Sequence, residues 1–445
     1  MDTQAPEQTT SVGSDEAAFR WLRQNAIPIR HIEAGHGFAD LQPLKTVLKD
    51  VQVVGLGETT HGTREFFQFK HRLLEFLAVE MGFTAFAIEA SYAACQPIND
   101  YVLHGRGNRA DVLTGQGYVP WDTEELAEML DWMRAYNQRV PGDRKVRFFG
   151  VDLWRNDLGR QAVLDYLDKL GSDRRMAAAT LFEALAREEA KWPAHIDEAA
   201  EAALGQLLPQ IESHIDHLLA NQDGFVARSS PSEFDSAMQY ARVMRQWLIA
   251  NTPDALHPSQ PRSSARSVFM AQNLIHLIDR DRPGARTVAW AHNVHVSLEN
   301  LWTGEPNWGR CLRERHGQGY YSLGFEFNQG SFYTRTQLPN HDLGDLKEVV
   351  FPPAPEGSWP WYLARANKGD LILNLRAPAG VPAVEQWLNT PRRVRHANWG
   401  YDEQSTYGGD VNLMRKYDGV IYIGSTTPTC PTANAWKTVA NRAWL

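Results

Sequence analysis

The sequence predicts an α/β protein: a three-layer α/β/α core with a mainly parallel sheet and an inserted helical subdomain. Apolar β-branched and aromatic runs alternate with helical periods in the first 157 residues, and the same alternation resumes after residue 265. Strands and helices that alternate in this way are typical of a parallel sheet covered on both faces. Residues 158–264, between these stretches, show helical periodicity alone, which predicts the insertion.

The first predicted strand, over 51–56, leads into a loop that carries Glu58 and His61. A helix follows, with its apolar residues on one face and Gly82 as a glycine C-cap. Lys70 falls at the centre of that apolar face, where a buried cation needs a carboxylate partner. The strand, loop and helix therefore bring a carboxylate, an imidazole and an ammonium group into one region.

The remaining elements follow from the same patterns. Further strands are predicted over 84–88, 146–151, 287–291, 321–327, 370–375 and 419–423. Core helices are predicted over 15–25, 44–49, 94–103, 123–137 and 267–278, and helices of the insertion over 158–170, 177–191, 198–220 and 232–249. The stretch 351–360 holds four prolines and is expected to be a loop.

These elements divide the chain into four expected segments. They are a disordered polar tail over 1–15, a first part of the α/β core over 16–157, the helical insertion over 158–264, and a second part of the core over 265–445. The insertion is expected either to form a lid or wall over the functional site or to be a solvated layer that only packs on the core.

Composition excludes several classes of function. The net charge of −8, without any cluster of Lys and Arg, argues against a nucleic-acid partner. The N-terminal residues lack the apolar stretch of a signal peptide or a membrane span. Cys95, Cys311 and Cys430 have no C-x-x-C spacing, so we expect reduced thiols in a cytoplasmic protein. The 15 Trp residues suggest either an apolar cleft or core packing, and oligomeric state is not predicted.

Four predicted strands end in ionisable residues: Glu58, Glu89, Asp152 and His292. In open α/β sheets, ligands bind in the crevice at the carboxyl ends of the strands. These residues are therefore expected to share an active-site cleft. The alternative is a set of unrelated loop residues and helix caps, and an Asp before a helix, as at Asp152, is often such a cap.

The residue types favour direct activation of water. The chain lacks the third glycine of a dinucleotide fingerprint, a P-loop and a G-x-S-x-G nucleophile, which leaves His and Glu without a covalent nucleophile. A carboxylate can orient a histidine that removes a proton from water as it attacks a carbonyl. The alternative is a metal site with Glu58, His61, His292 and His295 as ligands. No H-E-x-x-H helix supports a metal, and a nearby lysine would repel it, so no cofactor is expected.

Several motifs, taken in order, resemble the erythromycin esterase family. They are Gly57-Glu58-Thr59-Thr60-His61-Gly62, Glu65-Phe66-Phe67 with Lys70-His71, Gly82-Phe83-Thr84-Ala85-Phe86 leading to Glu89, Ala291-His292-Asn293-Val294-His295, Gly324-Phe325-Glu326-Phe327 and Tyr417-Asp418-Gly419-Val420-Ile421. The resemblance implies a three-layer α/β/α fold and hydrolysis of the lactone ring of macrolide antibiotics, which confers resistance. Relatives also include proteins labelled as succinoglycan-biosynthesis-like.

Carried over by residue, the resemblance implies that His61 is the general base with Glu58 beside it, and that Glu89 and His292 complete the catalytic set. Lys70, His295 and Asp152 are the expected substrate-binding residues. We further expect at least one of Glu58 and Glu89 within hydrogen-bond reach of His61.

Two positions depart from the family pattern. Lys70 stands where macrolide-hydrolysing relatives carry an arginine, and Ser267 stands where an Asp is usual. Lysine keeps the positive charge but loses the planar fork that grips an oxyanion at two points. The predicted function is hydrolysis of a lactone or other carboxylic ester, with a small-molecule substrate of apolar scaffold. The alternatives are a biosynthetic cyclase, dehydratase or esterase of the same superfamily and a non-catalytic ligand-binding or metal-binding protein.

Overall fold

The computed structural model describes the chain apart from residues 1–8, 192–197, 253–261, 281–282, 300–304, 338–342, 378–379, 398–399, 402–406 and 441–445. Its described part contains a ten-stranded sheet with the central order β1-β8-β12-β6-β2-β5-β3-β4. Six neighbouring strands in this order are parallel: β12 (Gly419–Thr426), β6 (Tyr320–Gln337), β2 (Val53–Leu56), β5 (Arg286–Trp290), β3 (Phe83–Ser91) and β4 (Arg147–Asp152). The predicted mainly parallel sheet is therefore confirmed.

The remaining strands lie at the margins of the sheet. β8 (Leu371–Asn374) pairs antiparallel with β12, and β1 (Ala26–Pro28) pairs antiparallel with β8. β7 (Leu343–Phe351) runs antiparallel beside β6, and β10 (Gly400–Tyr401) runs parallel to it. A separate pair is formed by β9 (Arg392–Arg395) and β11 (Tyr407–Val411).

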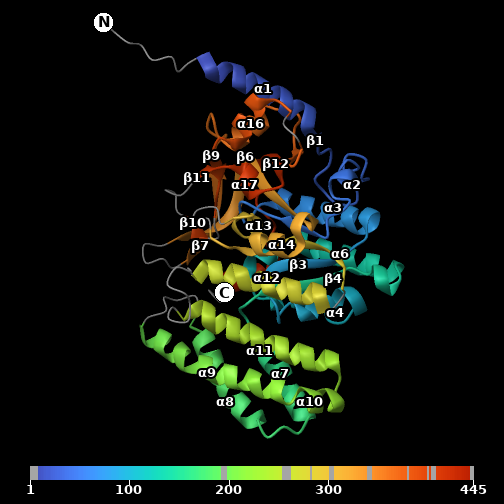
Figure 1. Cartoon of the computed structure of the whole chain (residues 1–445), viewed down its shortest axis with the longest axis vertical. Helices are drawn as coiled ribbons and strands as arrows, with labels where there is room; N and C mark the ends of the chain where they lie inside the picture. Colours follow the sequence, from blue (N-terminus) through green and yellow to red (C-terminus); the bar gives the residue numbers. More distant parts are fainter. Residues whose placement is uncertain are drawn as a thin grey trace.

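Helices cover both faces of the sheet (Figure 1). Val54 and Phe86 pack in a hydrophobic cluster with α3 (Arg64–Met81) and α6 (Glu124–Arg139). Their chain neighbours Val53 and Ala87 belong instead to a cluster with α12 (Arg262–Arg280) and α14 (Trp308–His316). Successive strand residues point to opposite faces, so the two clusters are the two interfaces of a three-layer core. The other core helices are α1 (Thr9–Asn25), α2 (Leu44–Val47), α4 (Gln96–His104), α5 (Arg109–Gly115), α13 (Asn293–Val296), α15 (Trp359–Ala364), α16 (Pro382–Asn389), α17 (Leu413–Lys416) and α18 (Ala433–Ala440).

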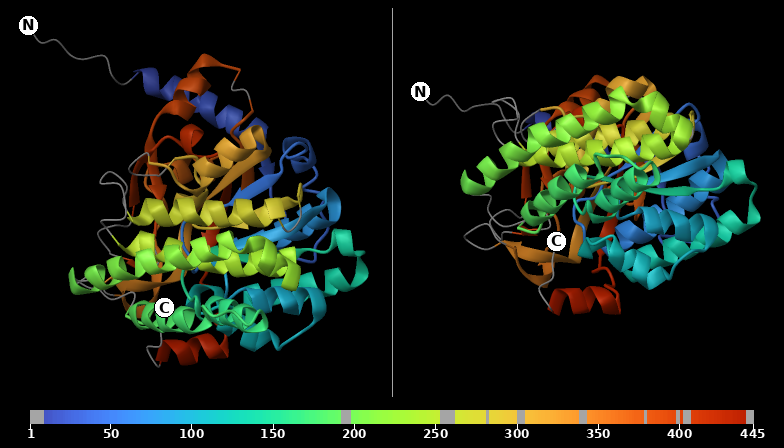
Figure 2. Two further views of the ribbon diagram at one scale, coloured as in Figure 1. Left: turned by 60° about the horizontal axis from the view of Figure 1, so that its bottom comes forward. Right: turned by 90° about the horizontal axis from the view of Figure 1, so that it is seen from below.

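Between β4 and α12 the described residues form a run of helices, as the periodicity there predicts. It comprises α7 (Asp157–Lys169), α8 (Arg175–Glu189), α9 (Glu198–Ala220), α10 (Gln222–Arg228) and α11 (Pro231–Asn251). These helices bury a hydrophobic cluster of their own, which includes Leu181, Ile211 and Leu248. Figures 1 and 2 show them as a layer beside α12. Within the residues described, no helix combines the length and hydropathy needed to cross a membrane.

Three local expectations were wrong. Residues 9–15, which were predicted to belong to a disordered tail, are part of α1, which begins at Thr9; residues 1–8 lie outside the described residues. The stretch 351–360 is not a loop throughout, since α15 begins at Trp359 with Pro360 in its first turn, where a missing N–H costs nothing. α10 lies between the helices predicted over 198–220 and 232–249, where no helix was predicted.

Candidate active site

Glu58 and His61 lie in the short loop between β2 and α3, which two glycines hold against its neighbours. A Cβ atom on Gly57 would lie 2.1 Å from Asn293 Oδ1, and one on Gly62 would lie 1.9 Å from the carbonyl oxygen of Tyr333. Any larger residue would therefore push the loop out of place. The loop is fixed by packing at both ends of the Glu58–His61 segment.

Glu58 is fully buried and is surrounded by donors. His61 Nδ1 lies 2.5 Å from Glu58 Oε1, while Lys70 Nζ and Trp290 Nε1 lie 2.5 Å and 2.7 Å from Oε2. A carboxylate only accepts hydrogen bonds, so the proton of the first contact resides on His61 Nδ1. The expectation that a glutamate lies within reach of His61 is confirmed for Glu58.

The His61 ring is held between aromatic side chains and is only 7% exposed. Its centroid is 5.3 Å from that of Trp121, 6.0 Å from that of Tyr118 and 5.1 Å from that of His292. Since Nδ1 donates to Glu58, Nε2 is the ring nitrogen that can accept a proton. The arrangement provides an imidazole whose ring orientation is fixed and whose Nε2 is left to accept a proton.

Lys70 satisfies the expectation that a cation on the apolar face of α3 needs a carboxylate. Besides Glu58, it contacts the face of Trp290, with Nζ 4.1 Å from the ring centroid. Burial lowers the pKa of Lys70 to about 8, against the opposing attraction of the Glu58 charge. The ammonium group is therefore much easier to deprotonate than an ordinary lysine.

Glu89, near the end of β3, forms the second carboxylate of the site. Its Oε2 accepts the backbone N–H of His292 at 2.9 Å, and its Oε1 lies 2.8 Å from Arg266 Nη2 and 3.2 Å from His295 Nε2. Burial alone would raise the pKa of Glu89, but its neighbours His295 and Arg266 outweigh burial and hold that pKa well below its usual range. Glu89 is thus ionised.

Arg266 is a site residue that sequence reasoning did not assign. It lies in the first turns of α12 and contacts Asp152 through Nε, at 3.0 Å from Oδ1, and through Nη2 to Oδ2. Its guanidinium also stacks on Trp154, 4.2 Å from the ring centroid. Asp152 is fully buried by this pairing. Asp152 is not the N-cap of the next helix, a position that Asn156 occupies.

The two histidines after β5 are bonded differently from His61. His292 Nε2 lies 3.2 Å from the carbonyl oxygen of Thr59, so Nε2 donates, and its Nδ1 accepts the Val294 N–H at 3.4 Å. Burial, together with neighbouring His61 and His396, lowers the pKa of His292 well below its ordinary value. His292 is therefore a neutral ring packed beside His61.

His295 lies beside Glu89, with Nε2 3.2 Å from Glu89 Oε1. Its Nδ1 is 3.0 Å from Ser267 Oγ, which also accepts the backbone N–H of Trp308 at 2.9 Å. Its Nε2 is 3.2 Å from Arg266 Nη1. The departure at Ser267 thus places a neutral hydroxyl, rather than a carboxylate, against His295.

All seven residues proposed from the sequence lie in one cluster, joined through Glu58, Glu89 and Arg266. Three further residues border the cluster and were not predicted, because no strand was predicted directly before them: Tyr118, Trp121 and His396. His396 lies 5.5 Å from His292 between ring centroids. Many of the Trp residues serve the core rather than a cleft: Trp121, Trp290, Trp308 and Trp359 are among the largest fully buried side chains.

Metal binding remains a separate question. Within the described ranges, no three His, Cys, Asp or Glu side chains are grouped as ligands of one metal ion. Lys70 is paired with Glu58, and Arg266 lies between Glu89 and Asp152. The expectation of a metal-independent site stays a prediction.

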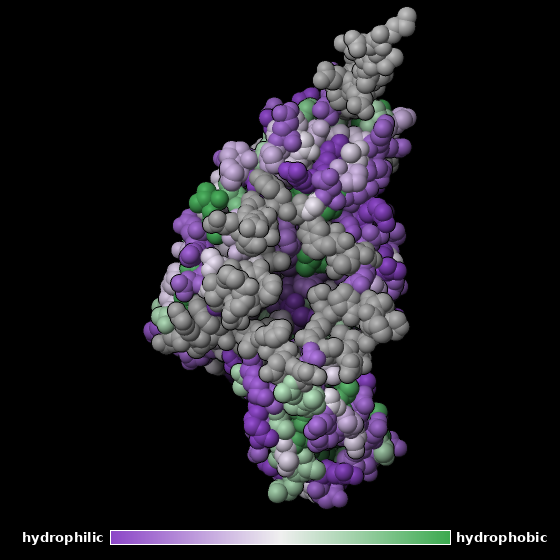
Figure 3. Space-filling view, turned by 90° about the vertical axis from the view of Figure 1, so that its left-hand side faces the viewer, coloured by the Kyte–Doolittle hydropathy of each residue, from purple (hydrophilic) through white to green (hydrophobic). Residues whose placement is uncertain are grey.

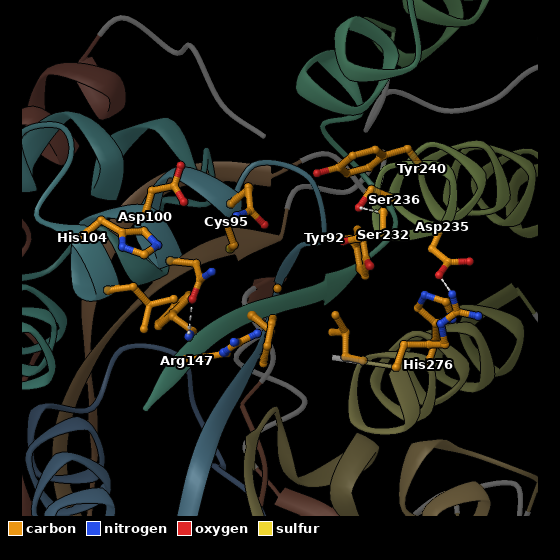
Figure 4. A pocket seen from close by; sticks show the side chains of 18 of the residues that line it. Tyr92, Cys95, Asp100, His104, Arg147, Ser232, Asp235, Ser236, Tyr240 and His276 are labelled. Carbon is orange, nitrogen blue, oxygen red and sulfur yellow. Dashed lines mark hydrogen bonds and ion pairs between the residues drawn. The ribbon is translucent and has the colours of Figure 1, made fainter. Parts of the chain in front are cut away.

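Two hollows of different character can be seen on the molecule. Seen from the left-hand side of Figure 1, the molecule is hollowed near its middle, with hydrophilic residues at the bottom (Figure 3). A separate cavity of about 740 Å³ lies at the edge strand β4, between α4, α11 and α12 (Figure 4). Its lining mixes acidic and basic side chains, including Asp100, Asp235, Arg147 and Arg280, and none of the cluster residues lines it.

Comparison with known proteins identifies similar sequences. A family model described as erythromycin esterase matches residues 78–426. Erythromycin esterase type II from Escherichia coli is 35% identical over 344 residues, which cover 72% of this chain and 79% of that protein.

Solved structures share the fold. A succinoglycan biosynthesis protein superimposes with a TM-score of 0.77 at 23% identity, over 94% of this chain and 99% of that one. A mutant of the erythromycin esterase EreC in its open conformation gives a TM-score of 0.66 at 16% identity, over 88% of this chain and 95% of that one. The three-layer fold is thus shared with these proteins.

Proposed function

The chain belongs to the erythromycin esterase family, and we propose that it is a hydrolase that opens a lactone or another carboxylic ester with water activated by His61. The observation that carries the proposal is the hydrogen bond from His61 Nδ1 to Glu58 Oε1. The other carboxylate oxygen of Glu58, Oε2, accepts hydrogen bonds from Lys70 and Trp290, which fixes the carboxylate in place. Family membership supports a hydrolase; the ester substrate and the role of His61 are the proposal.

The proposed reaction has two proton transfers. His61 Nε2 takes a proton from water as the water oxygen attacks the ester carbonyl, and Glu58 stabilises the imidazolium that forms. The tetrahedral intermediate then collapses, the C–O bond to the alcohol breaks, and His61 returns the proton to the leaving oxygen. The products are a carboxylic acid and an alcohol, and for a lactone both remain in one molecule. A well-placed general base contributes about 10²- to 10⁴-fold to such a rate.

The exposure of the remaining site residues decides whether they can contact the substrate. Lys70 and Asp152 are fully buried and bonded to opposite charges, so we assign them positioning roles in place of the substrate contact expected from the sequence. The His295 side chain keeps 10% exposure and stays the candidate for substrate contact. Neutral His292 packs against His61 and restrains its ring.

A macrolide-type lactone is the proposed substrate class, since the Escherichia coli relative is an erythromycin esterase. The ring of Tyr118, which lies edge-on to His61 and is only partly buried, suits a substrate with an apolar scaffold. We also propose that the helical subdomain, over 158–264, acts as a wall of the substrate cleft. The insertion leads directly into α12, and Arg266 in the first turns of α12 contacts the site residues Asp152 and Glu89.

The alternative function is a biosynthetic reaction on a non-macrolide substrate. Lys70 favours it, because macrolide-hydrolysing relatives resemble one another in carrying an arginine there, and the fold is shared with a succinoglycan biosynthesis protein. A lysine in the same place offers one contact point where arginine offers two. A third possibility, a binding protein without turnover, would require the same cluster to hold a ligand unchanged.

The test is incubation of the purified protein with a panel of macrolides, smaller lactones and linear esters, followed by mass spectrometry. The proposed hydrolase adds one water to at least one lactone or cleaves at least one ester. A panel without any product that contains added water would contradict the proposal, and loss of water from a substrate would favour the biosynthetic alternative.

A further inference from the structure

Arg266 connects three strand ends that carry the charges of the site. It binds Asp152 at the end of β4 through two nitrogens, Glu89 near the end of β3 at 2.8 Å, and His295 after β5 at 3.2 Å. The Arg266 side chain is 20% exposed, whereas Glu89 and Asp152 are almost wholly buried. The guanidinium is thus the shared counter-ion of two buried carboxylates.

The charges of the cluster do not balance. Glu58, Glu89 and Asp152 supply three negative charges, and Lys70 and Arg266 supply two positive ones. One negative charge remains while the imidazoles are neutral. A proton taken up by His61 brings the total to zero, so the cluster favours the imidazolium that general-base catalysis creates.

The electrostatic link from Arg266 to His61 passes through Glu89. A positive charge on His61 lowers the pKa of Glu89, so by linkage the Glu89 carboxylate stabilises a proton on His61. Arg266 partly neutralises that carboxylate and therefore opposes the effect. Removal of the Arg266 charge makes the surroundings of Glu89 more negative. Removal of the Asp152 charge makes them more positive.

We propose that Arg266 is a positioning residue that sets, together with Asp152, the pH range over which His61 can accept a proton. The proposal rests on the function proposed above, in which His61 is the base. The charged or titratable groups that border His61 or Arg266 from each neighbouring element are Glu58, Lys70, Glu89, Tyr118, Asp152, His292, His295 and His396.

The experiment follows the ring signals of His61 by NMR, in protein labelled at histidine, with the signal assigned from its absence in His61→Gln. Arg266→Gln should raise the pH at which His61 takes up a proton by about one unit, and Asp152→Asn should lower it by a similar amount. The double variant restores the charge of the cluster and should return His61 close to its original titration. Arg266→Lys keeps the charge and should also titrate close to the original.

The matched control is Arg175→Gln, which removes an exposed arginine on α8 that pairs with Asp168. It should leave the titration unchanged, because solvent and salt screen exposed charges. If Arg266→Gln fails to fold, Asp152→Asn and Arg266→Lys still decide the question.

Unchanged titration in Arg266→Gln and Asp152→Asn, or shifts of the same sign in both, would overturn the inference. The titration needs no substrate. Absence of ester turnover would therefore count against the proposed function alone, whereas unmoved titration alongside turnover that depends on His61 would count against the role of Arg266 alone.

Discussion

Glu58 Oε1 lies 2.5 Å from His61 Nδ1, and this contact sets the orientation of the base from inside the core. The other oxygen of Glu58 is held by Lys70 and by the indole N–H of Trp290, both of which are buried. The direction of the imidazole thus depends on residues of α3 and β5 rather than on loop residues alone. His61 can face substrate while its carboxylate partner stays out of water.

Replacement of Glu58 by Gln should lower kcat by about 10²- to 10³-fold. The amide has one oxygen and one NH₂ group, so either the NH₂ faces the Lys70 ammonium or it faces His61 and forces the other ring tautomer. Glu314→Gln, on the exposed surface of α14, is the matched control and should be silent. Steady-state kinetics on an ester substrate checks this, and a Glu58→Gln enzyme as fast as the control would remove Glu58 from the mechanism.

Activity should fall as the pH rises through about 8. The pKa of Lys70 is lowered to about 8, so the ammonium loses its proton there and Glu58 loses its cation. Lys70→Arg should extend the active range by at least about one pH unit, because arginine stays protonated in proteins. The measurement is a pH profile of kcat/KM, with Lys45→Arg, an exposed residue paired with Glu80, as the control. Identical alkaline limbs in the wild type and Lys70→Arg would contradict the assigned role.

Gly62→Ala should destabilise the protein by about 2 kcal/mol and lower activity with it. The added methyl group would overlap the backbone of Tyr333, which cannot move without disturbing the β6–β7 pair. Gly142→Ala is the control, since a Cβ atom there meets nothing within 4 Å. Thermal unfolding measures the difference, and equal midpoints for the two variants would show that the loop can yield.

Activity should survive prolonged chelation and dialysis. Activation by His61 needs a neutral imidazole with a free nitrogen, whereas a metal would occupy that nitrogen and would meet Lys70 and Arg266 beside the carboxylates. Turnover and elemental analysis before and after chelation provide the check. Loss of activity that a single divalent ion restores would make His61 a ligand and would refute its role as base.

Much of the fold follows from local pattern. The apolar runs before Glu58 and Glu89 predict central parallel strands, because such strands are buried on both faces. β7 could not be predicted in this way. It pairs antiparallel with β6 at the margin of the sheet, and its charged residues Asp345, Lys347 and Glu348 interrupt the apolar run that identifies a buried strand. The extension of β6 to Gln337 is likewise imposed by pairing with β7.

Residues after predicted strands could be assigned to the site, and so could Lys70 from its place on an apolar helix face. Glu58, Glu89, Asp152 and His292 carry the strand-end signal. Arg266 follows no predicted strand. It lies in α12, one residue before the helix predicted over 267–278, so its position in the sequence gave no reason to assign it to the site. A charge count could have found it: three expected carboxylates with Lys70 as the only expected cation leave buried charge without a partner.

The proposed mechanism depends most on His61. The decisive measurement is ester or lactone hydrolysis by the wild type and by His61→Gln, side by side, with circular dichroism and thermal unfolding to show that both are folded. The proposed mechanism predicts that the wild type hydrolyses at least one member of the panel and that the folded variant is at least about a hundredfold slower in kcat. Turnover by His61→Gln at close to the wild-type rate would contradict it.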